Sequence, residues 1–319
     1  MCTSVFLGTE KGFFGRNMDL YYDVSSSVII TPRKFSFDFR FEDTINEHFS
    51  IIGMGMVKDG YPLYFDGANE KGLCMAGLNF PGNACYSESI VGGKSNIASF
   101  ELIPWVLSKC ESIDDAKALL LTTSVIKINF NDRIPSSPLH WHIADADGSF
   151  VFEVTREGQR IYDDPVSVMT NNPPFDFHLL NLSQYQNLRV GNTENQLFHR
   201  GLKPFSDGMG SYGLPGDFSS ASRFVKVAYL TVNSKGEDID QFFHILDSVA
   251  VVRGSVLTET DQCVITKYSC GIDMISLIYY YKTYENNRLN AVSLKNCNLD
   301  GEKLFVYKIN NTQDIFFVN

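Results

Sequence analysis

Two neighbouring stretches near the start of the chain, MCTSVFLG (residues 1–8) and GFFGRNMDL (residues 12–20), decide how the sequence is interpreted. Both hold β-branched and aromatic residues between glycines, which is typical of short β-strands. The first places Cys2 directly after Met1, and an initiator methionine is removed when the second residue is small. Removal of Met1 would give Cys2 a thiol and a free α-amine, so a base would be tethered beside a nucleophile. The alternative is a buried strand cysteine that happens to be second.

Arg16 and Asp19 lie at the end of the second stretch. A guanidinium close to Cys2 would stabilise the thiolate, because an opposite charge favours the charged form. The Asp19 carboxylate could hold the α-amine through a hydrogen bond. Residues three apart point to opposite faces of an ideal strand, so both reach Cys2 only if the strand ends or bends near Met18. The alternative is a surface ion pair, which stabilises little.

Two asparagines stand at predicted strand ends beside proline or glycine, Asn79 in GLNFPG (77–82) and Asn171 in MTNNPPFD (169–176). An amide NH₂ at such a place can donate to a developing oxyanion. Turn formation, for which asparagine is well suited, is the alternative. A loop then enters a helix at LPGDFSSASRF (214–224), and Arg223 is either part of the site or a surface residue of the first helical turn.

The composition is that of an ordinary globular protein. The chain has 319 residues, of which 44% are hydrophobic and 20% charged, with 27 basic and 37 acidic side chains and a formal charge of −10. This excess of acidic residues argues against a nucleic-acid partner, whose affinity would come from cationic contacts. No apolar run is long enough to span a membrane, and the start lacks the basic region of a signal peptide. We therefore expect a cytoplasmic protein.

The cysteines and histidines do not indicate a metal site or a disulfide framework. The seven cysteines are scattered, odd in number and without a CxxC pair. His140 and His142 are two apart in a predicted strand, hence on one face, but a third ligand is missing nearby, so ordinary strand histidines are favoured. GMGSYG (208–213) matches a dinucleotide-binding pattern, but Pro215 follows at once and prevents the helix that such a site requires.

The order of predicted elements is strands, two helices, strands, two helices and strands. Helices are expected over residues 96–110, 112–121, 219–232 and 238–249, and a hairpin over residues 138–155. The last 60 residues are expected to be strands, including residues 274–284. This order lacks the regular alternation of a parallel α/β sheet and favours an α+β fold of mainly antiparallel sheets covered by helices. Residues 187–218 have no clear period, and a loop of this length is usually functional or interfacial.

Taken together, the motifs resemble the choloylglycine hydrolase family, and within it the bile salt hydrolases. The match follows the family's order over nearly the whole chain. It includes MCT (1–3), FGRNMD (14–19), NEKGLCMAGLNFPG (69–82), PLHWHIAD (138–145), TNNPPFD (170–176), GLPGDFSSASRF (213–224), FFHIL (242–246) and IYYYKTYENN (278–287). The resemblance implies a four-layer αββα fold of the N-terminal nucleophile hydrolases, in one domain over residues 2–319 after Met1 removal.

The resemblance also implies a catalytic set and a reaction. The family's catalytic residues fall on Cys2, Arg16, Asp19, Asn79, Asn171 and Arg223, with Asn171 favoured over Asn172 by the alignment of the motif. The implied reaction is hydrolysis of the amide bond of glycine- or taurine-conjugated bile salts through a Cys2 thioester, with the Cys2 α-amine as base. It needs no cofactor and no metal. We expect a steroid cleft near Tyr21, Phe65 and Ile134.

Several alternatives remain at this stage. Penicillin V acylase or a related N-acyl amidase would use the same chemistry, although that branch typically has tyrosine where this chain has Asn79. A binding protein for amphipathic anions would not need Cys2, and a thiol protease would need a histidine partner. Family members are usually homotetramers, so we expect a homotetramer, with residues 187–218 as a plausible assembly arm.

Overall fold

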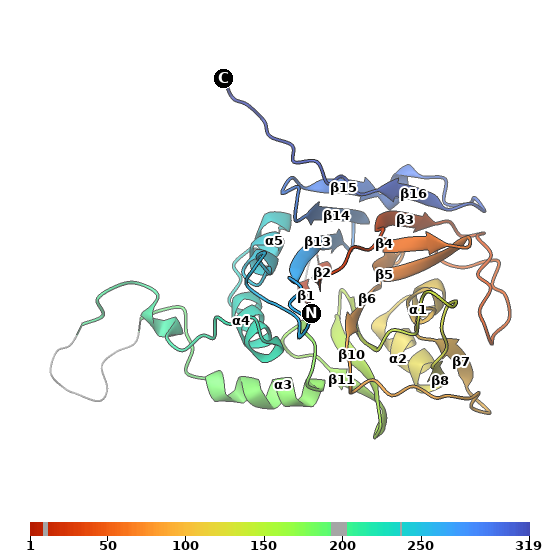
Figure 1. Ribbon diagram of the computed structural model, residues 1–319, viewed down its shortest axis with the longest axis horizontal. Helices are drawn as coiled ribbons and strands as arrows, with labels where there is room; N and C mark the ends of the chain where they lie inside the picture. Colours follow the sequence, from red (N-terminus) through yellow and green to blue (C-terminus); the bar gives the residue numbers. More distant parts are fainter. Residues whose placement is uncertain (9–11, 193–202, 237) are drawn as a thin grey trace.

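Two large β-sheets lie face to face, with helices on the outer side of each (Figure 1). The computed structural model describes residues 1–8, 12–192, 203–236 and 238–319. Within these residues, neighbouring strands of both large sheets pair antiparallel. Helices α4 (Ser220–Val232) and α5 (Ile239–Asp247) cover one sheet, and α1 (Leu102–Lys109) and α2 (Ile113–Leu121) cover the other. The predicted α+β class and αββα layering are confirmed.

The first sheet has six strands and contains the start of the chain. In spatial order these are β12 (Val168–Met169), β1 (Cys2–Leu7), β2 (Phe13–Leu20), β13 (Ile265–Asp273), β14 (Ile278–Thr283) and β15 (Asn290–Ser293). The second sheet has eight strands: β11 (Gly158–Asp163), β10 (Gly148–Thr155), β9 (Leu139–Asp145), β6 (Cys74–Asn79), β5 (Tyr61–Asn69), β4 (Ile51–Lys58), β3 (Ser27–Thr31) and β16 (Phe305–Lys308).

Two hydrophobic cores hold the layers together. One joins the two sheets and the α4–α5 layer and includes Phe14, Val151 and Phe242. The other lies between the eight-stranded sheet and α1, with Trp105 and Trp141 among its members. Burial of apolar surface at roughly 25 cal/mol per Å² is the main force that stabilises such layers. The first core contains Cys2, so the start of the chain is fixed by packing on both faces of its sheet.

The structure corrects three of the predicted elements. The helix expected over residues 96–110 is only α1, because Ser95–Ala98 form β7, which pairs in parallel with β8 (Thr123–Ile126). The strand expected over residues 274–284 is interrupted, since β13 ends at Asp273 and β14 begins only at Ile278. Helix α3 (Phe175–Leu182), directly after the TNNPP sequence, was not predicted.

None of the described helices is long and apolar enough to cross a bilayer.

Candidate active site

Cys2 is the first residue of β1 and is almost completely buried. It lies opposite Met18 of β2, and the Met18 sulfur is 4.0 Å from Cys2 Sγ. Arg16, also in β2, donates a hydrogen bond from Nη2 to Cys2 Sγ. The structure includes Met1, so the Cys2 nitrogen is a peptide N–H, and the Met1 ammonium donates to the main-chain oxygen of Asp19 at 2.9 Å. The predicted contact between Arg16 and the thiol is therefore present.

Arg16 is fully buried between the two sheets. Its Nη1 donates to the main-chain oxygens of Gly77 in β6 at 2.5 Å and Phe65 in β5 at 3.3 Å, so the opposite sheet fixes the guanidinium. Burial acts to lower the pKa of Arg16, but Cys2 and the neighbouring acidic groups outweigh it and raise the pKa above the usual arginine value. Arg16 therefore stays positively charged beside the thiol.

Asp66 supplies a buried negative group near Arg16 that the sequence did not reveal. It accepts hydrogen bonds from Tyr268 Oη at 2.7 Å and Tyr279 Oη at 2.5 Å. Burial raises the pKa of the Asp66 carboxyl, and the nearby Arg16 charge opposes that shift. The only sequence signal was a lone acidic residue inside the apolar strand YPLYFDGAN, a residue type that is rarely fully buried without partners.

Asp19 bonds to β13 rather than to Cys2. Strand β2 runs unbroken to Leu20 and so does not end near Met18; opposite Met18 and Asp19, the pairing of β13 is irregular between Thr266 and Tyr268. Asp19 Oδ1 accepts from Thr266 Oγ1 at 2.6 Å, and its buried Oδ2 makes no hydrogen bond to any described residue. Burial raises the pKa of Asp19, although Arg223 and the Met1 ammonium act in the opposite direction.

Asn171 connects the cysteine to the end of β6. Its Oδ1 accepts from the Cys2 nitrogen at 2.6 Å and from Arg223 Nη2 at 2.9 Å, while its Nδ2 donates to the main-chain oxygen of Asn79 at 2.8 Å. The neighbouring Asn172 instead donates to the main-chain oxygen of Pro81. Of the two adjacent asparagines, Asn171 is the one in contact with Cys2, as the motif alignment predicts. The Asn79 side chain is exposed at the strand end.

Arg223 is buried rather than exposed on its helix. It lies in the first turn of α4 and donates from Nη1 to the Cys2 oxygen and to Thr3 Oγ1. Burial lowers the pKa of Arg223, and the nearby Asp19 and Cys2 oppose that shift. The surface alternative is therefore wrong, and Arg223 anchors the main chain at Cys2.

His140 and His142 are buried histidines of β9, and within the described residues His142 Nε2 makes no hydrogen bond. His140 Nδ1 is 2.9 Å from Glu153 Oε1, and His142 Nδ1 is 2.9 Å from Ser4 Oγ. Across the described ranges, no group of three or more His, Cys, Asp or Glu side chains is placed to hold a metal ion.

The residues expected to line a steroid cleft lie at the surface. Tyr21 is 48% exposed and packs edge-on against Tyr22, while Phe65 and Ile134 are half-buried. Whether these side chains form one cleft stays a prediction.

The sequence model of the linear amide C–N hydrolases, choloylglycine hydrolase family, matches residues 2–307. The chain belongs to this family. This choloylglycine hydrolase family member is 41% identical over 325 residues to the bile salt hydrolase/transferase of Lactiplantibacillus plantarum. It is 40% identical over 329 residues to the bile salt hydrolase/transferase of Clostridium perfringens. Both alignments cover 100% of this chain and 100% of the relative.

Solved structures agree with this family membership. The C2A mutant of the conjugated bile acid hydrolase from Clostridium perfringens superposes with a TM-score of 0.94 at 40% identity, over 100% of both chains. The penicillin V acylase from Agrobacterium tumefaciens superposes with a TM-score of 0.75 at 19% identity, over 96% of this chain and 90% of the acylase. The second match shows a shared fold only.

Proposed function

We propose that this protein hydrolyses the amide bond of glycine- and taurine-conjugated bile salts to free bile acid and amino acid. The observation that carries the proposal is the Cys2 cluster: a buried thiol beside Arg16, with Asn171 and Arg223 bonded to the cysteine's main chain. The substrate class comes from the relatives named bile salt hydrolases, which are 40% and 41% identical over the full chain.

The proposed reaction begins after loss of Met1. The Cys2 α-amine takes the thiol proton, and the thiolate, stabilised by Arg16, attacks the amide carbonyl. Asn171 Nδ2 uses one hydrogen for the Asn79 oxygen, which leaves its second hydrogen for the oxyanion. The exposed Asn79 amide is the second proposed donor. The α-amine then protonates the leaving glycine or taurine, and water hydrolyses the thioester.

Asp19 and Arg223 have supporting roles in this proposal. Asp19 is buried close enough to the Met1 ammonium for that charge to act on its pKa, and its Oδ2 makes no hydrogen bond within the described part of the chain, so it is suited to orient the new Cys2 ammonium. Arg223 balances charge and holds the Cys2 carbonyl. The mechanism uses neither a metal ion nor an organic cofactor.

We also keep three wider expectations as proposals. Residues 2–307, which match the family model, support one domain over residues 2–319. The resemblance supports a homotetramer that acts in the cytoplasm.

A second candidate reaction is transfer of the bile acid to another amine. The two relatives named above are called hydrolase/transferase, and a thioester can be attacked by an amine instead of water. Penicillin V acylase activity remains the alternative for the hydrolase itself, and Asn79 weighs against it.

The test is release of free amine from glycocholate, taurocholate and penicillin V by the wild type and by Cys2→Ala, after mass spectrometry has confirmed Met1 removal. Release from the bile salts by the wild type alone supports the proposal. Release from penicillin V alone would move the protein to the acylase branch. No release from any of the three substrates would refute the proposed function.

A further inference from the structure

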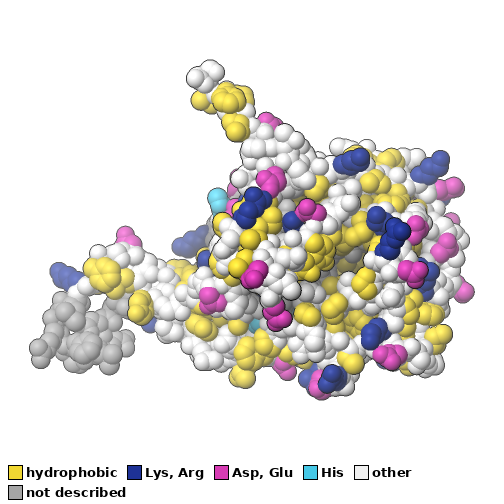
Figure 2. Space-filling view, in the orientation of Figure 1, with side chains coloured by type: hydrophobic (Ala, Val, Ile, Leu, Met, Phe, Trp, Pro, Cys, Tyr) yellow, Lys and Arg dark blue, Asp and Glu magenta, His cyan; other side chains and the backbone are white. Residues whose placement is uncertain are grey.

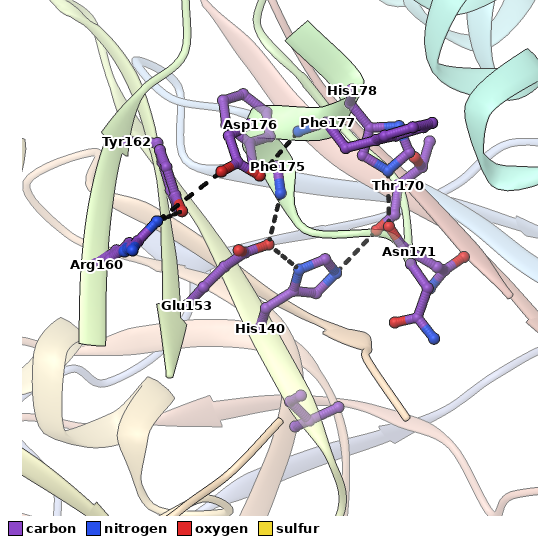
Figure 3. Close-up of polar contacts among 12 residues, drawn as sticks. His140, Glu153, Arg160, Tyr162, Thr170, Asn171, Phe175, Asp176, Phe177 and His178 are labelled. Carbon is purple, nitrogen blue, oxygen red and sulfur yellow. Dashed lines mark hydrogen bonds and ion pairs between the residues drawn. The ribbon is translucent and has the colours of Figure 1, made fainter. Parts of the chain in front are cut away.

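His140 and Glu153 form a fully buried polar pair behind the loop that carries Asn171 (Figure 3). His140 extends from β9 and Glu153 from the neighbouring strand β10. His140 Nδ1 is 2.9 Å from Glu153 Oε1, and its Nε2 is 3.0 Å from the main-chain oxygen of Thr170. The His140 ring also stacks on Phe80, with the ring centroids 4.1 Å apart.

Both partners of the His140 ring are hydrogen-bond acceptors. The Thr170 oxygen is a carbonyl, and Glu153 Oε1 already accepts from the Phe175 nitrogen at 3.1 Å. A carbonyl oxygen cannot donate, so Nε2 carries a hydrogen and donates it to Thr170, and a single hydrogen joins Nδ1 to Glu153 Oε1.

The pair fixes both ends of the segment 170–175. His140 holds the Thr170 carbonyl, and Glu153 accepts from Phe175, the first residue of α3. The N-cap residue of α3 is Pro174, whose side chain makes no capping hydrogen bond. Glu153 therefore supplies the acceptor for the first N–H group of the helix.

Two further contacts hold the main chain of Asn171 itself. His178 Nε2 is 2.9 Å from the Asn171 oxygen, and the Asn171 nitrogen donates to Ser220 Oγ at 2.9 Å. These hydrogen bonds hold the main chain of the loop and thereby determine where the Asn171 side chain lies.

We propose that the hydrogen-bonded His140–Glu153 pair is a positioning element of the active site, which holds the 170–175 loop so that Asn171 reaches Cys2. This inference rests on the proposed function, because it assigns the pair a role in the same reaction. A displacement of about 1 Å can cost about 10²-fold in rate, since catalytic geometry is exacting. The alternative is that this buried pair stabilises the fold and has no role in positioning Asn171.

Glutamine and asparagine provide the test, because the side-chain amide of each can replace one of the two ring nitrogens of histidine. The amide nitrogen of His140→Gln occupies the place of Nε2 and can still donate to the Thr170 oxygen. The amide nitrogen of His140→Asn occupies the place of Nδ1 and does not reach it. Both variants also carry Glu153→Gln, so that the buried side chain opposite position 140 is the same neutral amide in each.

The expected result is a loss of kcat with little change in KM for the asparagine variant only. Relative to Glu153→Gln alone, we expect H140Q/E153Q to keep kcat within about threefold and H140N/E153Q to lose about 10²-fold. With Asn171→Ala added, the two variants should no longer differ, because residues that act through one another are not additive.

His48 provides a matched control. Its ring nitrogens are 2.7 Å from the Phe49 oxygen and 2.8 Å from the Phe35 oxygen, so the same substitutions remove the same kind of contact elsewhere. H48N and H48Q should share the wild-type kcat.

Equal kcat for H140N/E153Q and H140Q/E153Q would overturn the positioning role, provided the wild type releases amino acid from the conjugates. An inactive wild type would instead refute the proposed function. A neutron crystal structure of the wild type tests the contact with Thr170 without any variant. Deuterium on Nε2 of His140 is expected, and a bare Nε2 would overturn the inference.

Discussion

At the scale of single residues, Asn171 links Cys2 to two further residues of the site. It is bonded to Cys2, Arg223 and Asn79 at once. We expect Asn171→Ala to lower kcat by about 10²–10³-fold, because an oxyanion donor is lost. Asn172→Ala is the matched control, since its amide donates to Pro81, and it should stay close to the wild type. Stopped assays of glycine and taurine release measure both, and an equal loss in the two variants would contradict the assignment.

A second prediction at this scale concerns Arg16. Its guanidinium donates to the Gly77 and Phe65 oxygens and to Cys2 Sγ at the same time. Lysine has no planar fork and does not make these contacts together. Arg16→Lys should therefore slow alkylation of Cys2 by iodoacetamide at neutral pH and lower kcat/KM. Alkylation followed by peptide mass mapping measures the first effect, because it separates Cys2 from the exposed Cys85 and Cys263. An unchanged alkylation rate would show that Arg16 does not stabilise the thiolate.

The sequence predicted the residues that touch Cys2 but not those that support them. Cys2, Arg16, Asn171 and Arg223 are joined by hydrogen bonds, whereas the Asp19 side chain bonds to Thr266 of β13. The supporting residues come from distant strands, and no fixed spacing connects them to the motifs. They are His140, Glu153, Asp66, Tyr268 and Tyr279.

At the scale of elements, the sequence predicted those helices and strands whose patterns and capping residues lie within or next to the element itself. Ser112 is the N-cap residue of helix α2, and its side chain accepts from the Asp115 nitrogen as the capping pattern predicts. Strand β7 was missed because its partner β8 is distant in the sequence. Helix α3 was missed because two prolines before it indicated a loop, although proline is tolerated at the start of a helix.

We expect two buried groups, one in α3 and one beside α1, to make the stability depend on pH. Burial lowers the pKa of His178 to about 4 from 6.5. Between these values the unfolded chain binds a proton and the folded chain does not, so stability falls as pH drops from 6.5 through 4, by up to about 3 kcal/mol. Burial raises the pKa of Glu101, beside α1, to about 7 from 4.5. Its effect has the opposite sign, because the stability it contributes is lost as pH rises through 7.

In the wild type the two slopes therefore offset each other, and only a variant separates them. With His178→Gln, the free energy of unfolding should fall by about 3 kcal/mol less than in the wild type between pH 7.5 and pH 4. Urea unfolding at several pH values measures the difference. Parallel curves for the two proteins would show that His178 does not bind its proton differently on folding.

At the scale of the whole molecule, the segment predicted as an assembly arm leaves the body of the protein beside α3 and α4 (Figure 1). Its residues 193–202 lie outside the described part of the chain. The parts of the segment before and after these residues contact each other, because the Arg189 nitrogen donates to the Gly210 oxygen at 3.0 Å. Tyr229 Oη of α4 donates to the Arg189 oxygen at 3.2 Å. Figure 2 shows hydrophobic side chains along this segment and on the C-terminal tail.

These exposed apolar side chains are the residues that we expect to make the assembly contacts. Phe205 is 89% and Tyr212 is 86% exposed, and large exposed apolar side chains gathered on one segment mark interaction sites. We expect the double variant Phe205→Ser/Tyr212→Ser to change the proposed tetramer into dimers or monomers of the 35.9 kDa chain, as measured by light scattering. Leu121→Ser is the control, because Leu121 is 63% exposed on α2, away from the arm, and should not change the mass. A tetramer in the double variant would place the assembly contacts elsewhere on the surface, and a wild-type monomer would refute the homotetramer itself.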